Sequence, residues 1–502
     1  MMAGVAITRG AQTEQAAKVR LETAPGPFHA SRASLAAYQV PDWFRDAKFG
    51  IWAHWGPQSA IEDGDWYARN MYMQGTPQNR YHVEHYGPPS RIGYKDLIPK
   101  WHASDFDPDY LVGLYKKAGA KYFVSMGVHH DNFDLWNSKY HGWNAVQMGP
   151  GKDVVGLFRN AAQKQGLKFG VTEHLWITYK WFSTSHGHDT TGPFARVPYD
   201  GADPRFASLY TDCKIVYKEL PWNEDGIPES WKQQWYRRVK DLVDTYQPDL
   251  LYTDGALPFE DYGLSIVANL YNLSAKRNGG VPSAVYNSKK PEDCAGGTCV
   301  LDVERGVVNG IWPTAWQTDT SVGDWHYRRN DTYKTPKQVI DLLVDIVSRN
   351  GNLLLNFPLP NSGALDSTEM SILSEITQWM NVNDEAIYGT RPWKIFGEGP
   401  STLPTTAAAD AKFNEKNRKD LTAQDVRFTT KGPVLYAFVM GVPDREVVIP
   451  ALGRQAPHAL PKIDNIELLG SGKVTWTREA NDLRVQLPPQ KPSKYALAFK
   501  IV

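Results

Sequence analysis

The sequence has few cysteines, no excess of either charge and no long apolar run. Three cysteines in 502 residues are too few for a disulfide scaffold. Lysine plus arginine equals aspartate plus glutamate at 55 each, which argues against a surface for nucleic acid or anionic membranes. No stretch approaches the roughly 20 consecutive apolar residues that span a bilayer. We therefore expect no nucleic-acid partner, no membrane partner, and a neutral ligand instead.

Two features of the sequence give information on the cellular compartment of the protein: its amino-terminal residues and one pair of cysteines. Residues 1–20 have neither a long apolar segment nor a convincing cleavage site, so they do not form a signal peptide as written. We expect a periplasmic or extracellular protein if a signal peptide has been removed, and a cytoplasmic protein otherwise. Cys294 and Cys299 in "CAGGTC" stand close enough to close a small loop in an oxidising compartment, and are inert thiols otherwise.

Short apolar runs of the strand type alternate with amphipathic helical patterns. Runs such as "YFVSMGVHH" and "NLLLNFP" are separated by helical segments such as "WYRRVKDLVDTYQ", in which apolar residues recur at intervals of three and four. Seven such runs, with an eighth at residues 315–319, favour an α/β fold of the (β/α)8 TIM-like barrel type over an open doubly wound sheet.

Nearly every predicted strand ends on a residue that can do chemistry. A barrel gathers the carboxyl ends of its strands around one pocket, so we expect these side chains to converge. They are His54, His129, His130, Glu173, His174, Asp254, Asn287, Glu304, Gln317 and Asn356.

The composition changes after about residue 393. Short alternating runs such as "KVTWTRE" and "YALAFKIV", with turn residues at close spacing, predict a small C-terminal antiparallel β-sandwich. We divide the chain into an N-terminal extension that packs loosely or not at all, a barrel, a connector and a β-sandwich. These parts cover residues 1–35, 36–393, 394–424 and 425–502.

Carboxylates at strand ends beside many tryptophans, without a nucleotide-binding loop, suggest glycoside hydrolysis. One carboxylate attacks the sugar or activates water, and the other protonates the leaving oxygen. Tryptophan rings pack against the C–H faces of a sugar while its hydroxyls meet polar side chains. Trp66 and Trp316 are among the tryptophans that stand beside polar candidates.

Several blocks of the sequence are long and unusual, among them "DAKFGIWAHWGPQSAIEDGDWYARNMY", "AKYFVSMGVHHDNFDLWNSKYHGWN", "PDLLYTDG" and "LVDIVSRNGNLLLNFPLPNSGALDSTEM". In order and spacing they resemble the alpha-L-fucosidases of glycoside hydrolase family 29, over roughly residues 40–395. The resemblance implies a barrel followed by a β-sandwich, no metal or other cofactor, and retaining hydrolysis of terminal alpha-L-fucose through a covalent intermediate. The implied partner is a fucosylated oligosaccharide or glycoconjugate, and a homo-oligomer is compatible with the sequence.

The resemblance also assigns roles to strand-end residues. Its nucleophile is the aspartate of "LLYTDG", here Asp254. The histidine of "HWG", the paired histidines and the acidic–Trp pair of "DWY" hold the fucose hydroxyls. In this chain they are His54, His129, His130, Asp65 and Trp66, with Asp65 in place of the usual glutamate. Adjacent histidines in an extended strand point to opposite faces, which argues against both of them binding one metal.

The sequence indicates the general acid/base residue less clearly than it indicates the nucleophile. Relatives often place a glutamate roughly 50 residues after the nucleophile, and Glu304 in "LDVERG" is the counterpart by spacing. Glu173, Asp302 and Glu260 are the competing carboxylates. Gln317 falls where some relatives carry a glutamate, but an amide cannot usefully exchange a proton.

Two of the predicted strand ends depart from the family pattern. Relatives often carry an arginine where this chain has Ser288 and Lys289, so the positive charge either comes from Lys289 or is missing. "VTEH" replaces a more common aromatic pair with Glu173 and His174, which we expect to bind substrate.

Two other classes of protein share part of this pattern: a fucose-binding protein that has lost one carboxylate, and a zinc-dependent barrel hydrolase.

Overall fold

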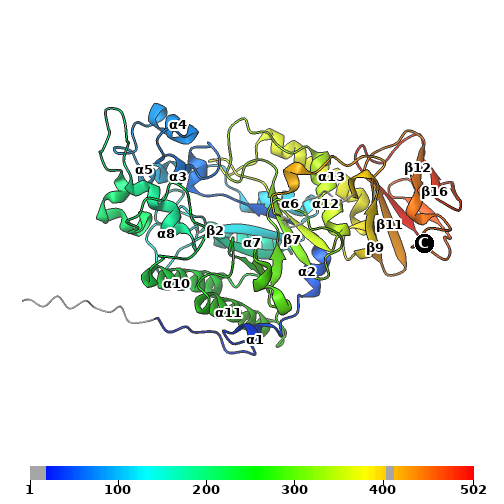
Figure 1. Ribbon diagram of the computed structural model, residues 1–502, viewed down its shortest axis with the longest axis horizontal. Coiled ribbons are helices and arrows are strands. Elements are labelled where there is room, and N and C mark those ends of the chain that lie inside the picture. The colour runs from blue at the N-terminus through cyan, green and yellow to red at the C-terminus, as the bar shows by residue number, and fades with distance from the viewer. Residues whose placement is uncertain (1–18, 403–411) are drawn as a thin grey trace, which may run out of the picture.

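The computed structural model describes residues 19–402 and 412–502. Eight parallel strands follow one another around a closed barrel, and the eighth pairs with the first, so the predicted (β/α)8 barrel is confirmed (Figure 1). The strands are β1 (Phe49–Ala53), β2 (Tyr122–Val128), β3 (Lys168–Glu173), β4 (Leu250–Tyr252), β5 (Val285–Ser288), β6 (Val300–Asp302), β7 (Trp316–Ser321) and β8 (Gly351–Asn356).

The barrel strands are buried between the barrel interior and the helices outside it, which is why they appear in the sequence as continuous apolar runs. The main helices are α6 (Pro108–Lys117), α7 (Val154–Lys164), α10 (Glu229–Tyr246), α11 (Asp261–Arg277), α12 (Pro336–Ser348) and α13 (Ser367–Asn383). Shorter helices lie in the connections: α1 (Arg32–Leu35), α2 (Asp42–Ala47), α3 (Tyr67–Asn70), α4 (Pro77–His85), α5 (Tyr94–Leu97), α8 (Thr178–Trp181) and α9 (Ala207–Tyr210).

Two antiparallel sheets form the C-terminal part, as predicted for residues beyond the barrel. One sheet has the order β14-β13-β17-β11-β10-β9 and the other the order β12-β16-β15. Their strands are β9 (Arg391–Glu398), β10 (Val426–Lys431), β11 (Val434–Val439), β12 (Glu446–Ile449), β13 (Ile466–Leu468), β14 (Gly472–Lys473), β15 (Trp476–Arg478), β16 (Leu483–Gln486) and β17 (Leu497–Ile501).

The predicted start of the connector at residue 394 falls inside β9. This strand pairs with β10, and its Trp393 and Ile395 pack on the core between the two C-terminal sheets. That boundary was wrong because β9 is an edge strand whose side chains are only partly buried, which leaves a weak apolar pattern.

Residues 19–35 lie along α10 and α11 (Figure 1). The backbone N–H of Phe28 donates to Asn272 Oδ1 at 2.9 Å, and Asn272 Nδ2 donates to the Phe28 carbonyl at 2.8 Å. Phe28 and Leu35 are buried. The expectation of loose packing was therefore wrong for these residues, because a few isolated apolar side chains carry the contact without a periodic pattern. Residues 1–18 of the predicted extension lie outside the described part.

A buried carboxylate joins the barrel to the C-terminal sheets. Asp345 of α12 pairs with Arg349 of the same helix at 3.1 Å, with Arg418 of the connector and with Arg427 of β10. Burial alone would raise the pKa of Asp345, but the three guanidinium groups hold it well below its usual range. The ion cluster thus fixes the connector and the first C-terminal hairpin against the outside of the barrel.

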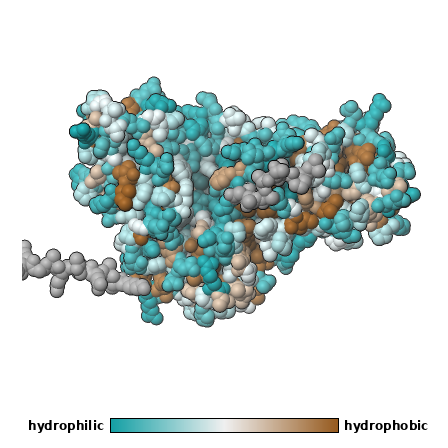
Figure 2. All heavy atoms as spheres, in the orientation of Figure 1, coloured by the Kyte–Doolittle hydropathy of each residue, from teal (hydrophilic) through white to brown (hydrophobic). Residues whose placement is uncertain are grey.

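The visible face of the molecule is mostly hydrophilic, and its apolar residues lie in separate small patches (Figure 2). Over the residues that the structure describes, no helix is both long and apolar enough to cross a membrane.

Candidate active site

Side chains at the carboxyl ends of the barrel strands surround a cavity of about 670 Å³. They include aromatic rings, imidazoles, carboxylates and an ammonium group. The lining residues are Trp52, His54, Asp65, Trp66, His129, His130, His174, Trp176, Trp222, Asp254, Gly255, Ala256, Lys289, Lys290, Glu304, Asp319, Trp325, Lys412 and Phe413.

Asp254 follows β4 with its backbone in the left-handed region, at a φ of 41°. Its Oδ1 accepts a hydrogen bond from Lys289 Nζ at 2.6 Å. Its Oδ2 lies 2.8 Å from His174 Nδ1 and 3.5 Å from His130 Nε2. Burial alone would raise the pKa of Asp254, but these neighbours, His174 and Lys289 above all, hold it well below its usual range. The cavity therefore contains a half-buried carboxylate that stays ionised.

Glu304 lies in the turn after β6 and shares the same ammonium group. Lys289 Nζ donates to Glu304 Oε2 at 2.6 Å as well as to Asp254 Oδ1 at 2.6 Å. The two bonded oxygens are therefore no more than about 5.2 Å apart, twice the length of either bond. Burial raises the pKa of Glu304, although Lys289 opposes this. The sequence left open whether this site carries a positive charge in place of the arginine of relatives. Lys289 supplies that charge.

Glu173 was predicted to bind substrate, and the structure contradicts this. The side chain is fully buried and does not line the cavity: Oε2 accepts from Trp235 Nε1 at 3.0 Å and from the Leu175 N–H at 2.9 Å. Burial raises the pKa of Glu173 to about 8. His174, the next residue, lines the cavity, because consecutive side chains at a strand end point to opposite sides.

The other two competitors for the acid/base role also lie away from the cavity. Glu260 is on the surface, where Arg32 Nη2 donates to it at 3.0 Å. Asp302 is buried inside the barrel, and Gln317 Nε2 donates to its Oδ1 at 2.9 Å. Of the four carboxylates considered from the sequence, Glu304 alone lines the cavity with Asp254.

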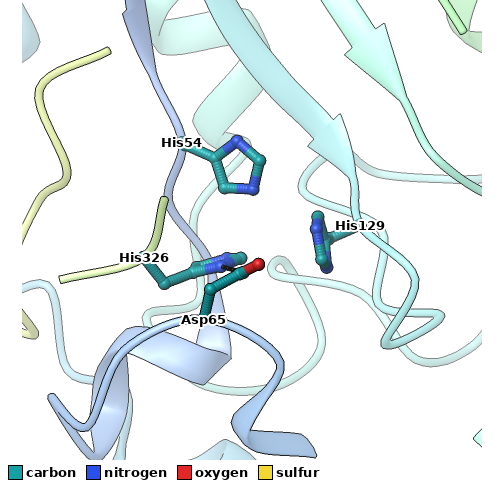
Figure 3. Close-up of side chains that lie close together, drawn as sticks. All are labelled: His54, Asp65, His129 and His326. Atoms are coloured by element: carbon teal, nitrogen blue, oxygen red, sulfur yellow. Dashed lines mark hydrogen bonds and ion pairs between the residues drawn. The ribbon is translucent and has the colours of Figure 1, made fainter. Parts of the chain in front are cut away.

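His54, Asp65, His129 and His326 project toward one another from four segments (Figure 3). Asp65 Oδ1 lies 2.6 Å from His326 Nδ1, and Gln58 Nε2 donates to His129 Nδ1 at 2.9 Å. Within the described residues, neither ring nitrogen of His54 has a hydrogen-bond partner. Burial holds the pKa of His54 and His129 well below the usual value, so both rings are neutral and can donate and accept. Such groups suit sugar hydroxyls.

These residues could also hold a metal ion. One ligand atom from each of His54, Asp65, His129 and His326 lies within 4.8 Å of the others, and the same is true of His129, His130 and His174. The sequence argument that adjacent histidines point to opposite faces was wrong here. His129 and His130 come after the end of β2 and both line the cavity, with ring centroids 4.5 Å apart.

Trp316 was predicted to bind substrate, and this was also wrong. It is the first residue of β7, at the opposite end of the barrel, where its buried Nε1 donates to the Arg349 carbonyl at 3.0 Å. The tryptophan of this region that lines the cavity is Trp325, which follows the carboxyl end of β7. A barrel strand brings only its last residues to the active-site face.

Sequence reasoning missed several site residues. His326 follows Trp325 in "DWHY", just beyond a strand end, and that position could have indicated it. Asp319 lies within β7, where its Oδ2 accepts from Tyr252 OH at 3.1 Å and lies 3.7 Å from Lys289 Nζ. Trp222 and Phe413 come from segments that carry no strand pattern, so only the fold places them at the cavity.

A disulfide joins Cys294 and Cys299 in the connection between β5 and β6. Replacing both cysteines by serine is expected to lower the free energy of unfolding by about 2 kcal/mol, because the bond closes a short loop in the unfolded chain. Thermal unfolding should show a lower midpoint, and a reductant should move the wild type toward the variant while leaving the variant unchanged. An equal effect of reductant on both proteins would contradict this.

A (β/α)8 barrel that brings two carboxylates together in a cavity lined by tryptophans and histidines defines a glycoside hydrolase. The sequence model of the Alpha-L-fucosidase family matches residues 15–385, and that of the Alpha-L-fucosidase C-terminal domain matches residues 418–502. The chain therefore belongs to the alpha-L-fucosidase family. The predicted family and activity class are confirmed.

Individual relatives agree with this assignment. The tissue alpha-L-fucosidase of Mus musculus is 26% identical over 492 residues, which cover 95% of this chain and 94% of the relative. The plasma alpha-L-fucosidase of Homo sapiens is 27% identical over 493 residues, covering 94% and 92%. Among solved structures, the Thermotoga maritima alpha-fucosidase in complex with fucose has the same fold, with a TM-score of 0.71, 23% identity, and 95% and 100% of the chains covered.

Proposed function

We propose that this alpha-L-fucosidase removes terminal alpha-L-fucose from fucosylated glycans with retention of configuration, using Asp254 as the nucleophile and Glu304 as the acid/base. The observation that carries the proposal is the single ammonium group of Lys289 between the two carboxylates. Their bonded oxygens are at most about 5.2 Å apart, which is below the 6.5–9.5 Å that inverting enzymes need for a water molecule and favours a retaining enzyme.

The protonation states fit the two roles. Asp254 has a pKa well below the usual range and is ionised, as a nucleophile must be, whereas the raised pKa of Glu304 favours the acid form. Two carboxyl groups whose surroundings push their pKa values apart are the expected arrangement for an acid and a nucleophile in one site.

The reaction proceeds in two steps. Asp254 attacks C1 of the fucosyl residue while Glu304 gives its proton to the glycosidic oxygen, so the bond to the leaving sugar breaks and a fucosyl ester forms on Asp254. Glu304, now a carboxylate, takes a proton from water, whose oxygen attacks C1 and breaks the ester. Two inversions release fucose in its original configuration, and Asp254 and Glu304 return to their starting states.

The imidazoles at the ends of β1 and β2 bind the fucosyl residue. The neutral His54 and His129, with Asp65 held by His326, offer donors and acceptors for the sugar hydroxyls. The ring of Trp66 lies at the same cavity and supplies an apolar face.

The direct test of the proposal is the configuration of the first product. Proton NMR during hydrolysis of an aryl alpha-L-fucoside should show alpha-L-fucose first, followed by slow appearance of the beta anomer through mutarotation. First release of the beta anomer would mean a single inversion and would exclude Asp254 as a covalent nucleophile. Activity that disappears after exhaustive chelation would point to a metal at the histidine cluster instead.

Replacing Lys289 by glutamine is expected to move the pH profile of kcat/KM to higher pH. Lys289 lowers the pKa of both Asp254 and Glu304, so its loss raises both. The acid limb requires ionised Asp254, and the alkaline limb requires protonated Glu304. Both limbs should move to higher pH by roughly 1–3 units, the scale expected for loss of a close opposite charge. Lys289→Arg keeps the cation and should keep the wild-type limbs. Unchanged limbs in Lys289→Gln would contradict the bridging role.

We also propose an oxidising compartment, periplasmic or extracellular, for this chain. The pairing of Cys294 with Cys299 supports it, since such bonds persist where thiols are not kept reduced. Thiol titration of the denatured protein from its natural source should find one free thiol, that of Cys213, and three free thiols would place it in a reducing compartment.

A further inference from the structure

Phe413 is an exposed aromatic residue at the mouth of the active-site cavity. Its exposed fraction is 50%, which is high for a phenylalanine, and it belongs to the connector rather than to the barrel. Single exposed apolar residues are common on protein surfaces, but this one lines the cavity that holds both carboxylates.

The connector is fastened at this point to the turn that carries Glu304. The Phe413 N–H donates to the carbonyl of Glu304 itself at 2.8 Å, and the Glu415 N–H donates to the Arg305 carbonyl at 3.0 Å. The side chain of Asn414 accepts from the Val307 N–H at 3.0 Å and donates to its carbonyl at 2.9 Å.

Side-chain contacts and backbone geometry complete the attachment. Glu415 pairs with Lys334 at 2.7 Å and accepts from the hydroxyl of Thr320 in β7 at 2.7 Å. Phe413 has a φ of 55°, a conformation that non-glycine residues adopt mainly where the surroundings hold them in it. Bonds from its own N–H and from the two residues that follow it thus hold Phe413 beside Glu304.

The position of Glu304 determines which part of the substrate lies against the Phe413 ring. A general acid must lie within hydrogen-bond reach of the leaving oxygen, so the leaving group extends from the cavity on the side of Glu304. Under the proposed function the fucosyl residue lies near the imidazoles of His54 and His129, which follow β1 and β2. A cavity of about 670 Å³ is within the range of clefts that hold ligands larger than one sugar. The space beside Phe413 is therefore left for the leaving group.

We propose that Phe413 forms the leaving-group subsite of this enzyme and that its occupant is a sugar, the next residue of a fucosylated glycan, whose apolar C–H face packs on the ring. The proposal rests on the proposed acid/base role of Glu304. It makes Phe413 a specificity-determining residue supplied by the connector, and it gives that segment a function beyond joining the two folded parts.

The test compares two substrates that differ in the leaving group. A fucosylated disaccharide requires the subsite, whereas alpha-L-fucosyl fluoride has a leaving group too small to touch Phe413. In Phe413→Ala, kcat/KM for the disaccharide should fall roughly tenfold, the scale of one aromatic contact, while kcat/KM for the fluoride stays at the wild-type value. Phe413→Tyr keeps the ring and should keep the disaccharide activity. Tyr110→Ala is the matched control, because Tyr110 is similarly exposed at 58% but lies on α6, outside the cavity lining.

A second measurement uses the covalent intermediate. With fucosyl fluoride as donor and an added acceptor sugar, Phe413→Ala should lower the ratio of transfer to hydrolysis, since the acceptor must occupy the same subsite. Equal loss on both substrates would mean that Phe413 acts by placing Glu304, and would overturn the subsite. No loss on either substrate would overturn it too, while leaving the fucosidase assignment intact. A wild type that hydrolyses neither substrate would overturn the proposed function itself.

Discussion

Asp254→Asn is expected to fold normally and to lose about 3–6 kcal/mol of transition-state stabilisation, a fall in kcat/KM of several orders of magnitude. The amide has nearly the same shape as the carboxylate, but it cannot attack C1 to form the ester. Turnover of an aryl fucoside measures the loss, and circular dichroism and thermal unfolding check the fold.

The matched control for this variant is Glu173→Gln. Glu173 is buried near the cavity, and its pKa of about 8 leaves it mostly protonated at neutral pH, so the amide replaces a similar neutral group. It points toward Trp235, away from the cavity, and its variant should keep activity. Wild-type turnover by Asp254→Asn would show that another group is the nucleophile.

Glu304→Ala is expected to harm substrates according to how much their leaving group needs a proton. Hydrolysis of a fucosylated glycan should fall roughly 100- to 10,000-fold, the usual contribution of general acid catalysis. An aryl fucoside with an acidic phenol should still form the covalent intermediate, because the phenolate leaves unaided, but the intermediate should then be hydrolysed slowly for lack of a base. Stopped-flow measurement should show a fast release of phenol followed by slow turnover.

Azide gives a sharper signature for the same variant. The anion can enter the space left by the side chain of Glu304, attack C1 of the intermediate and break the ester to Asp254, which raises the turnover rate. Because this is the second inversion at C1, the product is alpha-fucosyl azide. The alkaline limb of the pH profile should disappear, since it reports deprotonation of Glu304. Equal losses on both substrate types, no rescue by azide and an unchanged pH profile would move the acid/base role to another group.

The sequence predicted the barrel because its strands are buried on both sides. That burial requires nearly continuous apolar runs, which stand out between amphipathic helices. The connector boundary inside β9 and the loose packing of residues 19–35 were wrong predictions, because the contacts of these segments involve only a few side chains and backbone groups. Partial burial of this kind leaves no period in the sequence.

Within the site, the sequence predicted which strand ends matter better than which side chains reach the cavity. Glu173 and His174 are neighbours, yet only His174 lines the cavity. Trp316 and Trp325 belong to one stretch of the chain, yet only Trp325 does. The direction of a side chain depends on strand register and on where the strand ends, and neither is fixed by residue type.

By itself, then, the sequence determined the class of fold and the family, because local patterns and long motif blocks carry that information. It also predicted Asp254 and Glu304 as the two catalytic carboxylates, and both line the cavity. The tertiary structure alone decided that Lys289 bridges the two carboxylates, that His326 holds Asp65 and that Phe413 reaches the cavity from the connector. Each of these contacts joins residues whose separation in the chain has no fixed relation to their distance in space, so only the closed barrel and its attached connector bring them together.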